Sequence, residues 1–118
     1  MVFDQYPASI HWGSLEVMPS GLRVYQDGKR VTLTLRQFEA LMAFLANPHR
    51  TLSREDVWRF CLQQEGRTGE SPDPQYRMVD VYVAQLRRRL GRDVIETVRG
   101  VGYQLGPSGG SPALDKSS

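Results

Sequence analysis

The chain has 118 residues, enough for one domain with a core of its own, and 40% of them are apolar, which argues against general disorder. The single cysteine, Cys61, excludes a disulfide within the chain and fits a reducing compartment. The net charge is only +2, but six arginines and three acids lie between Arg77 and Arg99, a local net of +3. No apolar run approaches the roughly 20 residues of a membrane-spanning helix, and no secretory signal is visible.

The N-terminal third predicts a small antiparallel sheet. Residues 1–13 have no clear hydrophobic period, and we expect them to form a loose entry segment. From Leu15 to Leu33 short apolar runs alternate with turn signals, among which Asp27-Gly28 is a strong hairpin pair.

Two helices are expected next, each with a marked start. Thr34 and Gln37 form a capping box for the first, which Asn47-Pro48 should end. Ser53 and Asp56 repeat the device for the second. Cys61 falls on the apolar face of this second helix, so we interpret it as a small core residue and not as a nucleophile.

The third helix should follow a polar loop over residues 63–75. Asp73-Pro74 is a good start signal and Gly91 a good stop. Its periodicity separates a core face (Val79, Val83, Leu86, Leu90) from an opposite face that carries Arg77, Val81, Ala84 and Arg88, with Gln85 beside them.

The outer face of this helix has the chemistry of a major-groove reader. Arginine can pair with guanine, Gln85 with adenine, and Val81 can contact a thymine methyl. Taken alone, the pattern also fits an ordinary amphipathic surface helix.

Val94 to Leu105 predicts two short strands around Arg99-Gly100-Val101-Gly102. Such a hairpin projects Arg99, and beside a basic helix it can reach the neighbouring minor groove, where arginine is favoured. The bare G-x-G within it is a weak nucleotide signal, because no helix follows. We expect residues 107–118, rich in glycine, serine and proline, to be disordered.

An enzyme is not expected. His11 and His49 are isolated in the sequence, and neither a metal-spaced cluster nor a phosphate loop is present. We therefore expect no catalytic residue, no metal and no cofactor.

The stretch from Leu33 to Leu105 resembles the winged-helix effector domain of bacterial OmpR/PhoB-type response regulators, the output half of two-component systems. The motifs that carry the resemblance are Leu33-Thr34 with Phe38-Glu39-Ala40-Leu41, Asn47-Pro48, Leu52-Ser53-Arg54-Glu55, Val79-Asp80-Val81, Leu86-Arg87-Arg88-Arg89-Leu90 and Thr97-Val98-Arg99-Gly100-Val101-Gly102-Tyr103.

The resemblance implies an α+β fold, a winged helix-turn-helix with an N-terminal antiparallel sheet of four strands, three helices and a C-terminal β-hairpin wing, here over residues 14–106. It implies a cytoplasmic transcription regulator that binds double-stranded DNA, with the third helix in the major groove and the wing in the minor groove. It also implies direct repeats bound head to tail by a domain that is monomeric or weakly associated in solution. The loop at 62–75 is the segment that can touch RNA polymerase. With Arg88 from the helix pattern, the expected DNA-binding residues are Arg77, Val81, Tyr82, Ala84, Gln85, Arg87, Arg88, Thr97, Arg99 and Tyr103.

The chain departs from the family pattern at several points. Ala84 and Gln85 stand where basic residues are common, and Leu62 stands where a phosphate-contacting tryptophan is common, with Trp58 one turn earlier. The loop at 63–75 is longer than usual, and the receiver domain that normally precedes the module is absent from this sequence. The chain is therefore either an excised effector domain or a protein that works without phosphorylation. The alternative function is a winged helix that binds only protein.

Overall fold

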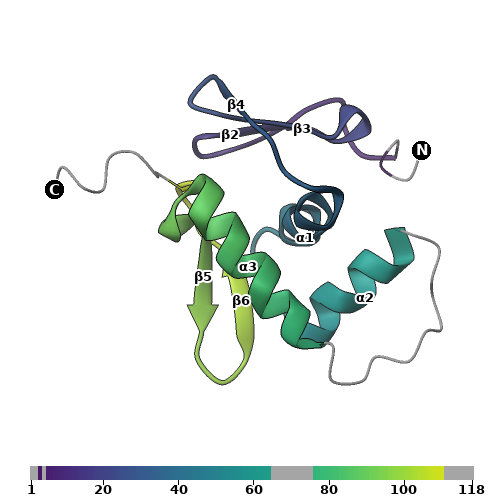
Figure 1. The fold of residues 1–118 in the computed structure, drawn as a ribbon, viewed down its shortest axis with the longest axis vertical. Coiled ribbons are helices and arrows are strands. Elements are labelled where there is room, and N and C mark those ends of the chain that lie inside the picture. The colour runs from purple at the N-terminus through teal and green to yellow at the C-terminus, as the bar shows by residue number, and fades with distance from the viewer. Residues whose placement is uncertain (1–2, 4, 65–75, 111–118) are drawn as a thin grey trace, which may run out of the picture.

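The computed structural model describes residues 3, 5–64 and 76–110, and their element order is that of a winged helix (Figure 1). A four-stranded sheet comes first, three helices follow, and a two-stranded hairpin ends the fold. The elements are β1 (Ile10–Trp12), β2 (Leu15–Met18), η1 (Pro19–Gly21), β3 (Arg23–Gln26), β4 (Lys29–Val31), α1 (Leu35–Leu45), α2 (Arg54–Gln64), α3 (Arg77–Leu90), η3 (Arg92–Val94), β5 (Ile95–Val98) and β6 (Gly102–Leu105).

The N-terminal sheet is antiparallel in the order β1-β2-β3-β4. Asp27 and Gly28 join β3 to β4 with φ angles of 52° and 81°. Positive φ at both central positions gives the hairpin turn whose twist matches that of the strands, so the predicted turn pair is confirmed.

The expected loose entry segment is wrong for the residues nearest the sheet. Ile10–Trp12 form β1, which pairs with β2 through Trp12 and Leu15. Further back, Phe3 is fully buried, and its ring meets that of Phe38 edge-on at 5.3 Å. A three-residue strand shows no period in the sequence, and its pairing with the next strand is what defines it.

Both predicted capping boxes are present. At α1 the Gln37 backbone N–H donates to Thr34 Oγ1 (3.2 Å), and Gln37 Oε1 accepts from the Thr34 backbone N–H (3.0 Å). At α2 Ser53 and Asp56 make the same reciprocal pair, at 3.0 and 2.9 Å. These bonds satisfy backbone donors that a helix start leaves open.

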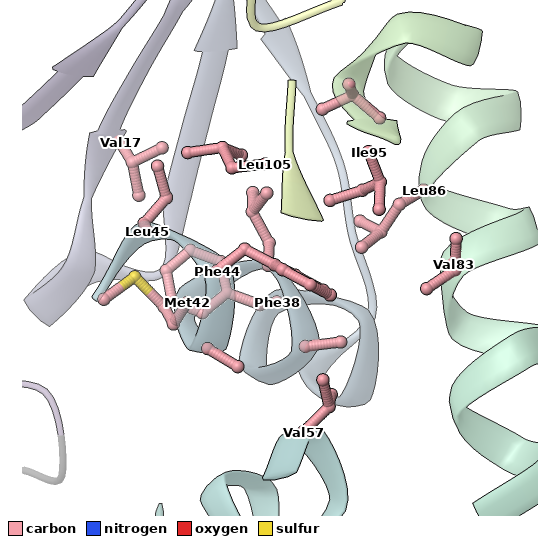
Figure 2. Packing of buried hydrophobic residues seen from close by; sticks show 14 of the residues in the cluster. Val17, Phe38, Met42, Phe44, Leu45, Val57, Val83, Leu86, Ile95 and Leu105 are labelled. Carbon is pink, nitrogen blue, oxygen red and sulfur yellow. The ribbon is translucent and has the colours of Figure 1, made fainter. Parts of the chain in front are cut away.

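The core surrounds α1, which is buried from Gln37 to Leu45. Figure 2 shows the apolar side chains that meet there from the sheet, α2, α3 and the hairpin, among them Val17, Val57, Leu86 and Ile95. Cys61 is buried in the same cluster, as predicted.

The expected disordered tail is wrong for residues 107–110. Ser108 O accepts from the Ser14 backbone N–H (2.9 Å), and Gly109 O accepts from Gln26 Nε2 (3.0 Å). Both Gly109 and Gly110 are buried. Ser14, between β1 and β2, and Gln26 of β3 bind the backbone of this segment, so its polar composition does not reveal that it is ordered. Residues 111–118, the loop at 65–75 and the predicted start at Asp73-Pro74 lie outside the described residues.

Candidate nucleic-acid interface

Helix α3 has one buried face and one face exposed to solvent. Its buried residues are Val79, Val83, Leu86 and Leu90, which confirms the predicted core face. It ends at Gly91, whose φ of 104° disfavours a side chain there. The exposed residues of α3 are the four predicted for its outer face, Arg77, Val81, Ala84 and Arg88, together with Met78 and Arg89.

The C-terminal half of α3 carries concentrated positive charge. Arg87, Arg88 and Arg89 occupy the last turn, where cations also interact favourably with the helix dipole. A shallow hollow of about 460 Å³ lies between Ala84, Arg87, Arg88 and Arg92. The small side chain of Ala84 leaves room there, so this part of the surface can receive an anionic group between several guanidinium groups.

Arg87 fixes the hairpin of β5 and β6, the wing, to α3. Its Nε and Nη2 donate to the Ile95 carbonyl at 2.9 and 2.8 Å, and Nη2 also donates to Thr97 Oγ1 at 2.9 Å. The guanidinium group also lies over the Tyr103 ring, 5.7 Å from its centroid. Arg87, predicted to face DNA, thus holds the wing beside the exposed face of α3.

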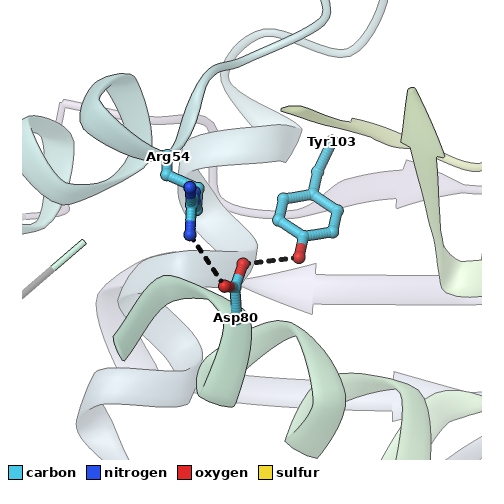
Figure 3. A network of polar contacts seen from close by, with 3 residues as sticks. All are labelled: Arg54, Asp80 and Tyr103. Atoms are coloured by element: carbon cyan, nitrogen blue, oxygen red, sulfur yellow. Dashed lines mark hydrogen bonds and ion pairs between the residues drawn. The ribbon is translucent and has the colours of Figure 1, made fainter. Parts of the chain in front are cut away.

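A second polar contact joins the wing to α2 and α3, and Figure 3 shows its three members. Asp80 Oδ1 accepts from the Tyr103 hydroxyl (2.6 Å), and Asp80 Oδ2 accepts from Arg54 Nη1 (3.0 Å). Burial raises the pKa of Tyr103, and the hydrogen bond to Asp80 and the negative charge of Asp80 raise it further. The Tyr103 phenol therefore stays neutral and donates its hydrogen bond to Asp80.

The wing tip presents a cation beside an exposed apolar residue. Arg99 is exposed and Val101 is 57% exposed, while Gly100 between them has a φ of 78°. Gly102 has a different reason to be glycine, because a Cβ there would overlap the Leu52 carbonyl oxygen. Of the two predicted hinge glycines, Gly100 is thus the turn residue, and Gly102 allows the backbone at Leu52 to approach closely.

The predicted site residues fall into three groups. Six are exposed on α3 or the wing: Arg77, Val81, Ala84, Arg88, Thr97 and Arg99. Three are partly buried and make intramolecular hydrogen bonds: Gln85, Arg87 and Tyr103. Tyr82 is partly buried and packs against the core.

The sequence reasoning missed Gln37, Arg54 and Asp80 as members of this region. Gln37 Nε2 donates to Gln85 Oε1 at 3.0 Å, although the two residues lie 48 positions apart. Nothing in the local pattern around either glutamine indicates the other. Arg54 and Asp80 lie in family motifs on two different expected helices. Their opposite charges were the signal from which a contact between these helices could have been predicted.

Two absences hold for the described part of the chain. No helix within residues 3, 5–64 and 76–110 has both the length and the apolar character needed to cross a bilayer. Over the same residues, no three side chains of the metal-ligating types gather in one place.

Comparison with known proteins places the chain among transcriptional regulators. A family model described as "Transcriptional regulatory protein, C terminal" matches residues 28–105. The chain is 40% identical over 98 residues to transcriptional regulatory protein CseB of Streptomyces coelicolor, a match that covers 80% of this chain and 38% of CseB. It is 33% identical over 97 residues to regulatory protein VanRB of Enterococcus faecalis, with 79% and 40% covered. The chain thus spans about two fifths of the length of these relatives.

Solved structures agree with the sequence match. The DNA-binding domain of Klebsiella pneumoniae RstA, in complex with the RstA box, superposes with a TM-score of 0.69 at 27% identity, covering 86% of this chain and 99% of that one. DrrB of Thermotoga maritima, an OmpR/PhoB homologue, gives 0.68 at 25% identity, with 86% and 46% covered. Since the family model matches more than half of the chain and the fold agrees, the chain belongs to the C-terminal effector domains of OmpR/PhoB-type response regulators.

Proposed function

We propose that the chain binds double-stranded DNA sequence-specifically and regulates transcription, with α3 in the major groove and the wing in the minor groove. The observation that carries this proposal is the exposed basic face of α3, with the wing fixed beside it by Arg87 and Arg99 exposed at its tip. A helix fits the major groove of B-form DNA, and an arginine is favoured in a narrow minor groove.

Two related domains support the choice of partner. The RstA structure is a complex with its DNA box, and the AdeR DNA-binding domain, 25% identical to this chain with a TM-score of 0.68, is in complex with an intercistronic region. RNA binding is less compatible with this surface, because the major groove of A-form RNA is too narrow for α3.

Burial and hydrogen bonding support a division of roles among the predicted residues, in which Arg87 holds the wing and Tyr82 packs against the core. We propose that Arg77 and Arg88 bind phosphates, that Val81 and Gln85 contact base edges, and that Arg99 enters the minor groove. Thr97 would offer its hydroxyl at the wing, Tyr103 would support the wing through its bond to Asp80, and Ala84 would leave space for the approaching backbone.

The assembly belongs to the same proposal. Two copies would bind head to tail on a direct repeat with half-sites about one helical turn apart, from a cytoplasmic domain that is monomeric or weakly associated in solution. RNA polymerase would be contacted through the segment predicted at 62–75, although residues 62–64 are the last residues of α2 and residues 65–75 lie outside the described residues.

Selection of bound duplexes from a random pool tests the proposal, because it reports the half-site, its spacing and its orientation together. The affinity for the selected site is then measured over a range of salt concentrations, and each phosphate contact should add roughly 0.9 to the log–log slope. We expect a defined direct repeat and a steep slope. A chain that enriches no sequence and binds with a flat salt dependence would instead be a protein-binding winged helix.

A further inference from the structure

Gln85 is partly buried on α3, beside the exposed face, and a side chain of another helix contacts it. Its Oε1 accepts a hydrogen bond from Gln37 Nε2 at 3.0 Å. Gln37 lies in the first turn of α1, and only 8% of the residue is exposed. The amide that faces Gln85 is therefore itself held in one place.

Three residues, Thr34, Gln37 and Gln85, are joined by two hydrogen bonds, and the Thr34 backbone N–H determines the direction of both. The Thr34 backbone N–H can only donate, so the Gln37 atom that meets it at 3.0 Å must be the oxygen, Oε1. The amino group Nε2 is then the end of Gln37 that faces Gln85, and an amide nitrogen donates. Gln85 must meet it with its own oxygen, which turns the Gln85 amino group away from Gln37.

We propose that Gln37 sets the hydrogen-bond polarity with which Gln85 reads DNA, so that Gln85 presents a donor and selects a base edge that accepts. This inference rests on the proposed function, in which α3 enters the major groove. Guanine offers two adjacent acceptors there, O6 and N7, whereas adenine offers one acceptor and one donor. A paired contact with adenine needs both ends of the amide at the base edge, and the bond to Gln37 keeps the oxygen end directed toward α1. Guanine therefore replaces adenine as the expected partner of Gln85.

The capping role of Gln37 does not account for this second bond. A capping box needs only an acceptor at the third helical position, which glutamate supplies as well as glutamine. Only glutamine adds a donor. The substitution Gln37→Glu therefore separates the two roles, since it keeps the cap and places the new negative charge at a helix N-terminus, where it is tolerated.

The test compares duplexes that differ only at the base pair read by Gln85, which selection with Gln85→Met identifies as the position that loses its preference. In Gln37→Glu, one carboxylate oxygen binds the Thr34 N–H and the other accepts from Gln85 Nε2. The Gln85 amide then turns its oxygen toward the DNA. We expect the affinity ratio of guanine to adenine at that position to change by about tenfold in favour of adenine, the size of one base contact.

The charge added by Gln37→Glu should weaken binding to every duplex by the same factor. The measured quantity is therefore the ratio of the affinities for the guanine and adenine duplexes. The matched control is the pair Gln85→Met with and without Gln37→Glu, and in that background the ratio should not change. An unchanged ratio in Gln37→Glu alone, or an adenine preference in the unsubstituted chain, would overturn the proposal.

A measurement without DNA keeps this inference separate from the proposed function. By NMR, the side-chain amide protons of Gln37 should exchange with water more slowly in the unsubstituted chain than in Gln85→Met. Equal exchange would show that Gln37 does not orient Gln85, whether or not the chain binds DNA. If the Gln37 side-chain amide protons exchange slowly, as expected, but the chain binds no duplex, the result counts against the proposed function and not against this inference.

Discussion

Gln26→Met should destabilise the fold although no apolar contact is removed. Gln26, at the end of β3, is 6% exposed, and its Nε2 donates to the carbonyls of Leu90 (2.7 Å) and Gly109 (3.0 Å). Leu90 is the last residue of α3, where backbone carbonyls lack partners within the helix. One side chain thus joins the sheet to the end of α3 and to the segment after the wing.

The size of the destabilisation depends on which hydrogen-bond donors remain for each carbonyl after the substitution. Gly109 O shares the Ser14 hydroxyl (3.1 Å) with the Gly110 carbonyl (2.9 Å), so it keeps part of its hydrogen bonding and the loss of the Gln26 donor costs about 1 kcal/mol. Leu90 O loses the donor that Gln26 supplies, and an unsatisfied buried carbonyl costs about 1–3 kcal/mol. Methionine fills a similar volume and recovers part of this loss, so we expect the free energy of unfolding to fall by about 2–3 kcal/mol.

Urea denaturation followed by circular dichroism measures this difference, and Gln63→Met is the matched control. Gln63 is exposed on α2, so its substitution should change the free energy of unfolding by less than about 0.5 kcal/mol. The reasoning is refuted if Gln26→Met changes stability as little as the control does.

Three further predictions concern the surface and the wing. Arg88→Ala should lower affinity about equally for all DNA sequences and reduce the log–log salt slope by about 0.9, because one phosphate contact is lost; affinities for several duplexes at several salt concentrations measure both. Arg99→Ala should weaken binding most for sites with an A·T-rich segment beside the half-site, and an equal loss on G·C-rich flanks would make Arg99 a phosphate contact only. The pKa of Tyr103 is raised from its ordinary value of 10.0 in the folded chain, so the neutral phenol stabilises the fold below that pH and its contribution is lost as pH rises through the folded pKa. Tyr103→Phe should therefore show a shallower loss of stability as the pH rises above about 10, and the same alkaline decline in both chains would contradict the assignment.

Local signals in the sequence were enough to predict the helices, and long-range contacts account for what was missed. A capping box joins residues three apart, so Thr34 with Gln37 and Ser53 with Asp56 were visible as pairs. The periodicity of α3 likewise separated its buried face from its exposed one. The strand β1 and the segment 107–110 depend instead on partners elsewhere in the chain, and their own composition is that of a loop.

The candidate site shows the same division. Exposed positions such as Arg88 and Arg99 could be predicted, because helical phase and a glycine turn determine where a side chain points. The sequence could not show that Arg87 is bonded to Ile95, or that Gln85 is bonded to Gln37, because each of these bonds depends on how two elements pack. The base that we propose for Gln85 therefore could not be inferred without the structure.

The wing is joined to the rest of the fold along its backbone as well as by side chains. Leu52, between α1 and α2, exchanges two backbone hydrogen bonds with Tyr103 at 2.8 and 2.9 Å, while Arg87 holds the other strand at Ile95. With both strands held, the distance between the base of the wing and α3 is restricted. If the two elements enter neighbouring grooves as proposed, the DNA must adjust where the spacing of its grooves differs from that distance. The stiffness of the duplex then contributes to affinity at base pairs that no side chain touches.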